Sequence, residues 1–203
     1  SNNKVVVSYV DDADSAKGKS VVGTVSGTNI SFGSPANFYT SRAAFVRSTF
    51  DSTNNKVVVS FSDQSSNQYG RAAVGTVSGT SISFGTSVAF ESAVVNDTSC
   101  VFDSTNGKVV IAYQDAGNSN RGTAIIGTVS GTTISFGSAV VFESGSSSRF
   151  FSAFDSNSKN VTISYYDAGS TNGTAIVLQN ATTGTTLTAE NFIGFANGAA
   201  ADG

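Results

Sequence analysis

Short runs of alternating bulky and smaller side chains recur along the chain, separated by turns rich in Gly, Asn and Ser. In "KVVIAYQD" (residues 108–115), alternate side chains point to opposite faces of an extended strand. One face is then bulky and the other small. The division recurs in "KVVVSFSD" and "NVTISYYD". We expect the bulky residues to be buried between sheets: Val57, Val59, Phe61, Val109, Ile111, Tyr113, Val161, Ile163 and Tyr165.

The chain repeats itself with a period of 52 residues. The segments "GTVSGTNISFG", "GTVSGTSISFG" and "GTVSGTTISFG" begin at Gly23, Gly75 and Gly127. Each unit reads as four short strands joined by Asn-Gly and Ser-Gly turns, because Gly accepts the positive φ that tight hairpins need. The predicted units are residues 1–41, which lack a first strand, 42–92, 93–144, and 145–197 with an altered last strand, before the start of a truncated C-terminal segment at 198–203.

A sheet with one large and one small face can stack on copies of itself, as neighbouring blades of a β-propeller do. The unit length lies close to the ~40–50 residues of propeller repeats. The sequence therefore predicts an all-β fold, a β-propeller-like array of four-stranded antiparallel blades. An open β-solenoid or a stack of hairpins is the alternative. Small residues crowd the first strand of each unit, and we expect the single cysteine, Cys100, to be a small buried hydrophobe on that strand.

Composition removes several kinds of chemistry. The chain has no His, so serine and cysteine triads lose their usual base and zinc its commonest ligand. The net charge is −3 and the basic residues are scattered, which argues against a nucleic-acid partner. No apolar run approaches the ~20 residues of a membrane span. We expect no cofactor and no membrane association. The chain opens without Met, which indicates a processed protein or a fragment.

The loop between the second and third strands carries the candidate binding residues. Lys17, Tyr69 and Arg121 occupy matching positions in successive units, and Lys19 and Arg71 lie next to them. Long or aromatic side chains on one rim of a repeating framework are suited to binding sugars or carboxylates. A solvated, charged turn is the alternative interpretation.

Acidic residues recur once per unit and have two interpretations. Asp63, Asp115 and Asp167 end the second strand and could contribute to a Ca²⁺ site. They could equally accept backbone N–H bonds and fix the turn, which we favour because further acidic ligands are missing. Glu91 and Glu143 suggest a glycosidase pair, but they are equivalent positions of successive units. We interpret them as edge charges on the surface.

The units "FDSTNNKVVVSFSDQ…RAAVGTVSGTSISFGTSVAFES" resemble the tandem repeats of virion structural and tail-fibre-like proteins of marine bacteriophages, especially cyanophages, and of related marine bacterial surface proteins. The closing "TTGTTLTAENFIGFANGAAADG" resembles the start of the C-terminal module that often follows such repeats. The resemblance covers almost the whole chain. It implies a structural or surface role, and it brings no catalytic residue with it.

The expected function is that of a non-enzymatic structural or adhesin module of a phage virion appendage, located in the virion or outside the cell. Its expected partners are other virion or surface proteins, host-surface glycans and further copies of itself. The alternatives are a bacterial surface adhesin and a secreted propeller hydrolase or lyase acting on polysaccharide. The absence of His and the even distribution of acids favour binding or structure over catalysis.

Overall fold

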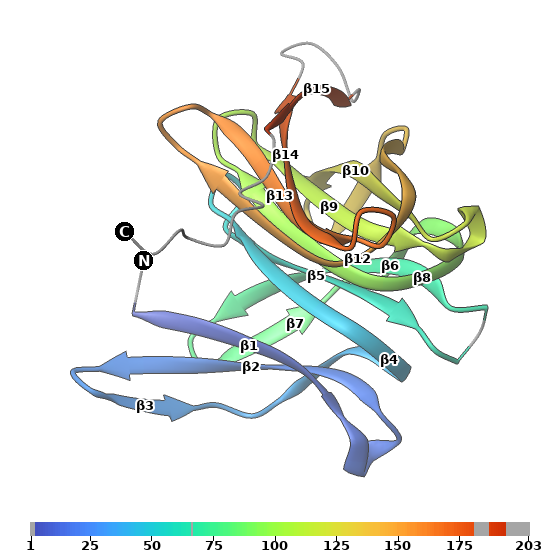
Figure 1. Cartoon of the computed structure of the whole chain (residues 1–203). Helices are drawn as coiled ribbons and strands as arrows, with labels where there is room; N and C mark the ends of the chain where they lie inside the picture. Colours follow the sequence, from blue (N-terminus) through green and yellow to red (C-terminus); the bar gives the residue numbers. More distant parts are fainter. Residues whose placement is uncertain (1–2, 66, 181–186, 194–203) are drawn as a thin grey trace, which may run out of the picture.

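The computed structural model describes residues 3–65, 67–180 and 187–193 and is built of antiparallel strands (Figure 1). The described residues form fifteen strands and two single-turn 3₁₀ helices. The strands are β1 (Lys4–Asp11), β2 (Lys17–Ser26), β3 (Asn29–Phe32), β4 (Ala36–Asp51), β5 (Lys56–Asp63), β6 (Tyr69–Ser78), β7 (Ser81–Phe84), β8 (Val88–Asp103), β9 (Lys108–Asp115), β10 (Arg121–Ser130), β11 (Thr133–Phe136), β12 (Val140–Asp155), β13 (Asn160–Asp167), β14 (Asn172–Asn180) and β15 (Leu187–Ile193). The 3₁₀ helices are η1 (Asp12–Asp14) and η2 (Ala116–Asn118).

The strands form one open sheet. Its path runs β1-β2-β4-β5-β6-β8-β9-β10-β12-β13-β14-β15, while β3, β7 and β11 pair with the far ends of β2, β6 and β10. The path ends at β1 and β15, so the sheet does not close into a barrel. The predicted all-β, antiparallel character is confirmed. The segment 198–203 lies outside the described residues, as does most of the closing stretch that resembles a C-terminal module.

We use "repeat 1" to "repeat 4" for the four sequence units, whose central hairpins are β1–β2, β5–β6, β9–β10 and β13–β14. The sequence predicted separate strands at the end of one unit and the start of the next, and this is wrong. One 16-residue strand joins them in each case. The first half of β8 pairs with β6 up to Val94, and from Val95 onward the strand pairs with β9.

A bulge accompanies each change of partner. Asp97 has a φ of 50° and interrupts the register of β8, and Phe45 and Arg149 have φ values of 52° and 60° at the equivalent points of β4 and β12. A bulge bends a strand and increases its twist without ending it. The chain therefore passes from one repeat to the next without a loop.

The repeats pack face to face. All nine bulky residues predicted to be buried are at most 5% exposed. Val109, Ile111 and Tyr113 of repeat 3 share a cluster with Val58 and Val74 of repeat 2, and equivalent clusters join repeat 1 to repeat 2 and repeat 3 to repeat 4. In each cluster the small face of the earlier repeat meets the bulky face of the later one.

The repeated segment "GTVSGTxISFG" is also a contact between repeats. A Cβ at Gly85, which ends the second copy, would lie 2.0 Å from the backbone oxygen of Thr132 in the third copy. Gly33 has the same relation to Thr80. Only Gly permits this approach, because backbone atoms cannot turn aside as a side chain can. Successive copies of the motif therefore touch each other.

Candidate functional site

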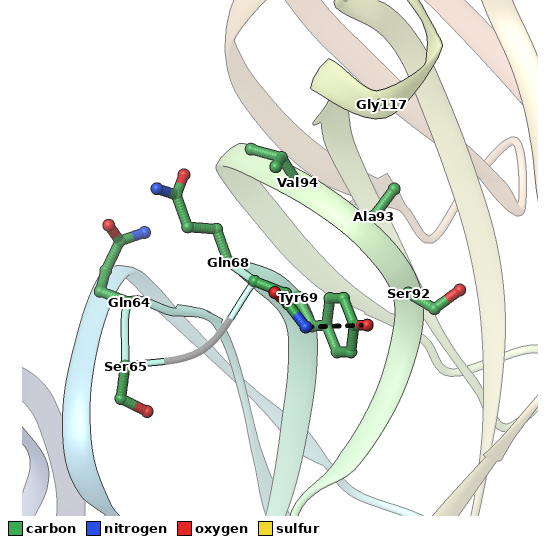
Figure 2. Close-up of a pocket in the computed structure, with 9 residues that line it drawn as sticks. Gln64, Ser65, Gln68, Tyr69, Ser92, Ala93, Val94 and Gly117 are labelled. Atoms are coloured by element: carbon green, nitrogen blue, oxygen red, sulfur yellow. Dashed lines mark hydrogen bonds between the residues drawn. The ribbon is translucent and has the colours of Figure 1, made fainter.

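An open hollow of about 610 Å³ lies between the loop that follows β5, the strand β8 and the η2 turn (Figure 2). Strand β8 belongs to both repeats that meet here, and η2 belongs to repeat 3. The hollow is lined by Gln64, Ser65, Asn67, Gln68, Tyr69, Ser92, Ala93, Val94 and Gly117.

The lining is uncharged, and six of its nine residues are polar. It offers three side-chain amides, two hydroxyls and the ring of Tyr69. The Tyr69 hydroxyl accepts a hydrogen bond of 3.2 Å from Nδ2 of Asn67, and Nε2 of Gln64 donates to the Ser62 hydroxyl at 2.9 Å. Each of these groups keeps further hydrogen-bonding capacity, since an amide carries both donors and acceptors. Such a surface can bind a hydroxyl-rich ligand.

The loop beside the hollow is held in place by its backbone. Asn67 and Gln68 have positive φ values of 39° and 55°. The Val95 N–H donates to the Gln68 carbonyl at 2.9 Å, and Tyr69 pairs with Val94 in the sheet. Because this loop is bonded to β8, its side chains and those of β8 are presented together.

Carboxylates support the wall on the β8 side. Oε1 of Glu91 accepts hydrogen bonds from the N–H groups of Ser92 and Ala93 at 2.8 and 3.1 Å. Oε2 accepts one from the hydroxyl of buried Tyr113 at 3.0 Å. Glu143 and Tyr165 repeat this contact at 3.0 Å. The interpretation of Glu91 and Glu143 as surface edge charges is therefore wrong. Both side chains are half-buried, and each accepts a hydrogen bond from the hydroxyl of a buried tyrosine.

Asp115 lies close to Glu91 and is almost fully buried. Burial, and then the negative charge of Glu91, raise the pKa of Asp115, although N–H groups of Asn118 and Gly117 donate to it. Its Oδ1 has no hydrogen-bond partner among the described residues. Burial, with Glu91 beside it, also raises the pKa of the Tyr113 hydroxyl. The acidic pair thus adjoins Ser92, Ala93 and Gly117, which line the hollow.

The equivalent aspartates fix turns in the other repeats. Asp63 accepts from the Ser65 N–H at 3.0 Å, and Asp167 accepts from the Gly169 N–H at 2.8 Å. The predicted turn-fixing role is confirmed for Asp63 and Asp167. Within residues 3–65, 67–180 and 187–193, no three His, Cys, Asp or Glu side chains gather closely enough to hold a metal ion.

The basic loop residues are engaged within their own repeats. Lys17 lies 2.8 Å from Asp14, and Lys19 lies 2.8 Å from both Asp11 and Asp14. Hydrogen bonds to these carboxylates raise the pKa of Lys19 above its ordinary value.

Two arginines of this loop, which occupy different positions in their repeats, also have partners. Nε of Arg71 lies 3.2 Å from buried Asp63. Arg121 donates to the Ser144 carbonyl at 3.3 Å and to Oδ1 of Asn118 at 3.1 Å. Of the five candidate binding residues, Tyr69 is the one that lines the hollow.

Sequence reasoning missed the amides and serines around Tyr69. Gln68 and Ser92 are distant in sequence and line one hollow because β6 and β8 pair. A signal for the supporting contact was present: Glu91 and Tyr113 occupy the positions that Tyr39 and Phe61 occupy in the preceding unit. The tyrosine therefore lies on the earlier strand in one pair (Tyr39 with Phe61) and on the later hairpin in the next pair (Tyr113 with Glu91).

Neither a scan against protein-family models nor a search of curated protein sequences finds a match for this chain. Among the residues that the structure describes, no helix is long and apolar enough to cross a membrane.

Proposed function

We propose that this chain is a non-enzymatic β-propeller module of a virion appendage or related surface protein, and that it binds surface glycans in the hollow beside Tyr69. The resemblance of its repeats to tail-fibre-like proteins of marine bacteriophages supports the virion or extracellular location. The other partners are further structural proteins of the same assembly.

The stacking of the repeats supports a propeller. The second halves of β4, β8 and β12, which are the first strands of successive units, are hydrogen-bonded to one another. The Thr98 hydroxyl donates to the Phe45 carbonyl at 2.7 Å, and the Ser152 N–H donates to the Ser99 hydroxyl at 2.8 Å. Small side chains let these strands approach. Convergence of the first strands with large-into-small stacking of the sheets is typical of propeller blades.

The composition of the hollow is the observation that carries the glycan proposal. Sugars present many hydroxyls and flat apolar faces, which amide and hydroxyl side chains and an aromatic ring complement. The hollow is open, which suits a segment of a long polymer. Presentation of several copies of the chain side by side then strengthens individually weak contacts through effective concentration.

Binding without turnover is favoured by the position of the acids. Catalytic carboxylates of a glycosidase flank the scissile bond. The side chains that line the hollow include no carboxylate. Both oxygens of Glu91 already accept hydrogen bonds from the protein, and Asp115 is almost fully buried.

A glycan array probed with a multimerised form of the protein tests the proposal, followed by titration of any ligand found. We expect weak single-site binding, with apparent affinity rising ~10²-fold on multimerisation. Tyr69→Ala should abolish binding, and Tyr69→Phe should retain most of it because the ring remains. Lys17→Ala is the matched control, since Lys17 has the same loop position but is paired with Asp14. Equal binding by wild type and Tyr69→Ala, or release of reducing sugar, would refute the proposal.

A further inference from the structure

Repeats 1 and 2 each carry a basic side chain beside the aspartate that ends the second strand of the unit. Nζ of Lys19 lies 2.8 Å from Asp11 in repeat 1, and Nε of Arg71 lies 3.2 Å from Asp63 in repeat 2. In the sheet of repeat 2, Arg71 lies directly opposite Phe61, which is two residues before Asp63. Directly opposed residues and alternate residues of a strand share a face. The basic side chain therefore lies on the same face as the carboxylate.

Repeat 3 has a threonine at this position. Thr123 lies directly opposite Tyr113, which is two residues before Asp115, so these side chains share the face that packs on repeat 2. On that face Glu91 of β8 accepts the hydrogen bond from Tyr113, and its negative charge acts on Asp115. At the four equivalent positions, repeat 3 thus meets repeat 2 with two acidic side chains and no basic one, whereas repeat 2 meets repeat 1 with one of each.

Two oxygen atoms of this cluster are buried without a hydrogen-bond partner among the residues that the structure describes. They are Oδ1 of Asp115, which is 8% exposed, and Oγ1 of Thr123, which is 2% exposed. Nor does any salt bridge join a basic side chain to Glu91 or Asp115 within the described part of the chain. A buried charge without a counter-charge and a buried hydroxyl without a partner both cost free energy. A bound cation removes both costs, since each of these oxygens has a lone pair to offer.

Repeat 4 has the same residue types but uses its aspartate differently. The residues at the four positions are Glu143, Tyr165, Thr174 and Asp167. Oδ1 of Asp167 accepts a hydrogen bond of 2.8 Å from the Gly169 N–H, and Oδ2 accepts one of 2.6 Å from the Ser170 hydroxyl. Asp167 is also more exposed than Asp115. The unpartnered carboxylate oxygen therefore distinguishes the contact between repeats 2 and 3.

We propose that a Ca²⁺ ion binds between Glu91 and Asp115, with the Thr123 hydroxyl as a third protein ligand, in the position of the basic side chain of repeat 2. The charge of the ion balances the two carboxylates. Ca²⁺ accepts about six to eight oxygen ligands in flexible geometry, including water. The site adjoins the hollow (Figure 2), because Ala93 and Gly117 each lie two residues after one of the acids. Two carboxylates are fewer than tight sites use, so we expect a Kd of about 10⁻⁴–10⁻³ M.

Thermal unfolding of the EDTA-treated protein at pH 7, in CaCl₂ or in NaCl of equal ionic strength, tests the proposal. At ~10 mM Ca²⁺ the melting temperature should be ~3–8 °C higher than in NaCl. Calorimetric titration with CaCl₂ should show saturable binding. Glu91→Gln and Asp115→Asn should each lose the rise. Asp115→Asn removes a buried charge and should be more stable than the wild type in EDTA, so its lost response does not reflect a lost fold.

Thr123→Arg supplies the cation from the chain, as Arg71 does in repeat 2. It should raise the melting temperature in EDTA and abolish the response to Ca²⁺. Glu143→Gln is the matched control, because Glu143 accepts the equivalent hydrogen bond from Tyr165 and lies outside the site. It should keep the response. A wild type with the same melting temperature in CaCl₂ and NaCl would overturn the proposal, as would a rise that Glu91→Gln, Asp115→Asn or Thr123→Arg retains in full.

Discussion

The hydroxyl of Tyr113 donates to Oε2 of Glu91 across 3.0 Å, joining the central hairpin of repeat 3 to the strand β8 that enters it. At the contact between repeats 1 and 2 the partners are exchanged. Tyr39 takes the place of Glu91, Phe61 takes the place of Tyr113, and the centres of their rings lie 4.9 Å apart. The Tyr39 hydroxyl bonds to Asp63. Two different pairs therefore fill one position in the stack, and each gives the phenol a carboxylate partner.

Tyr113→Phe should reduce the free energy of unfolding by about 1–2 kcal/mol, because it removes a hydrogen bond to a charged acceptor. Adding Glu91→Tyr copies the pair of repeat 2 and gives the new phenol Asp115 as its partner. Most of the lost stability should return. Urea unfolding of the wild type, the single and the double variant measures this.

Tyr166→Phe is the control for loss of a phenol, since Tyr166 is half-buried on the same strand as Tyr165 and its ring faces Arg149. It should change stability by less than ~0.5 kcal/mol. A double variant less stable than Tyr113→Phe alone would contradict the exchange between repeats.

The burial of residues such as Ile111 could be predicted, because the alternation of side chains along a strand is a local property. The same alternation also recurs in every unit. The bulge at Asp97 was not. No Gly or Pro marks the point where β8 changes partner, so the sequence reads there as a strand end rather than as a continuous strand.

The contact of Gly85 with Thr132 and the hollow beside Tyr69 were not predictable for another reason. Both depend on how one repeat sits on the next, and the residues involved are far apart in sequence. A matching loop position also implied a shared role for Lys17, Tyr69 and Arg121. Their neighbours differ, so Lys17 pairs with Asp14 while Tyr69 lines the hollow.

Two aspartates at equivalent positions should have opposite effects on stability against pH. The pKa of Asp115 is raised by burial and by Glu91, so its favourable contribution is complete below the ordinary value of 3.8 and is lost as the pH rises through the raised pKa. Burial alone would raise the pKa of Asp63, but hydrogen bonds from Ser65 and Tyr39 and the charge of Arg71 lower it. Its contribution is present above 3.8 and is lost as the pH falls through the lowered pKa.

Asp115→Asn should therefore stabilise the protein at pH 7 relative to wild type, and this gain should vanish toward pH 3. Asp63→Asn should destabilise it at pH 7, and that loss should shrink as the pH falls. Unfolding free energies measured in urea from pH 3 to pH 8 test both. Changes of the same sign at pH 7 would show that the local charges do not control these two sites.

Gly85→Ala should destabilise the protein by about 1–3 kcal/mol, because the new methyl group meets the Thr132 backbone and forces two repeats apart. Gly173→Ala is the control, since a Cβ there meets no atom within 4 Å. It should be neutral or slightly stabilising, as Ala restricts the unfolded chain. Thermal unfolding of both variants decides the point, and equal melting temperatures would contradict a tight contact between repeats.

Cys100 should be a poorly reactive thiol in the folded protein. It is half-buried on β8, packs on the cluster that joins repeats 2 and 3, and lies beside Ser60. Burial raises its pKa to about 11, and the bonds with Ser60 only partly oppose this. The thiolate is the reactive form, so at pH 8 only ~0.1% of Cys100 is reactive, against roughly a quarter of a free cysteine with a pKa of ~8.5.

Alkylation by iodoacetamide at pH 8 should be more than ~100-fold slower than that of a free thiol. The rate should rise about tenfold per pH unit up to pH 10, which separates a raised pKa from simple steric shielding, and it should reach the free-thiol rate in denaturant. Rapid alkylation of the folded protein at pH 8, or a rate that does not change with pH, would contradict this assignment.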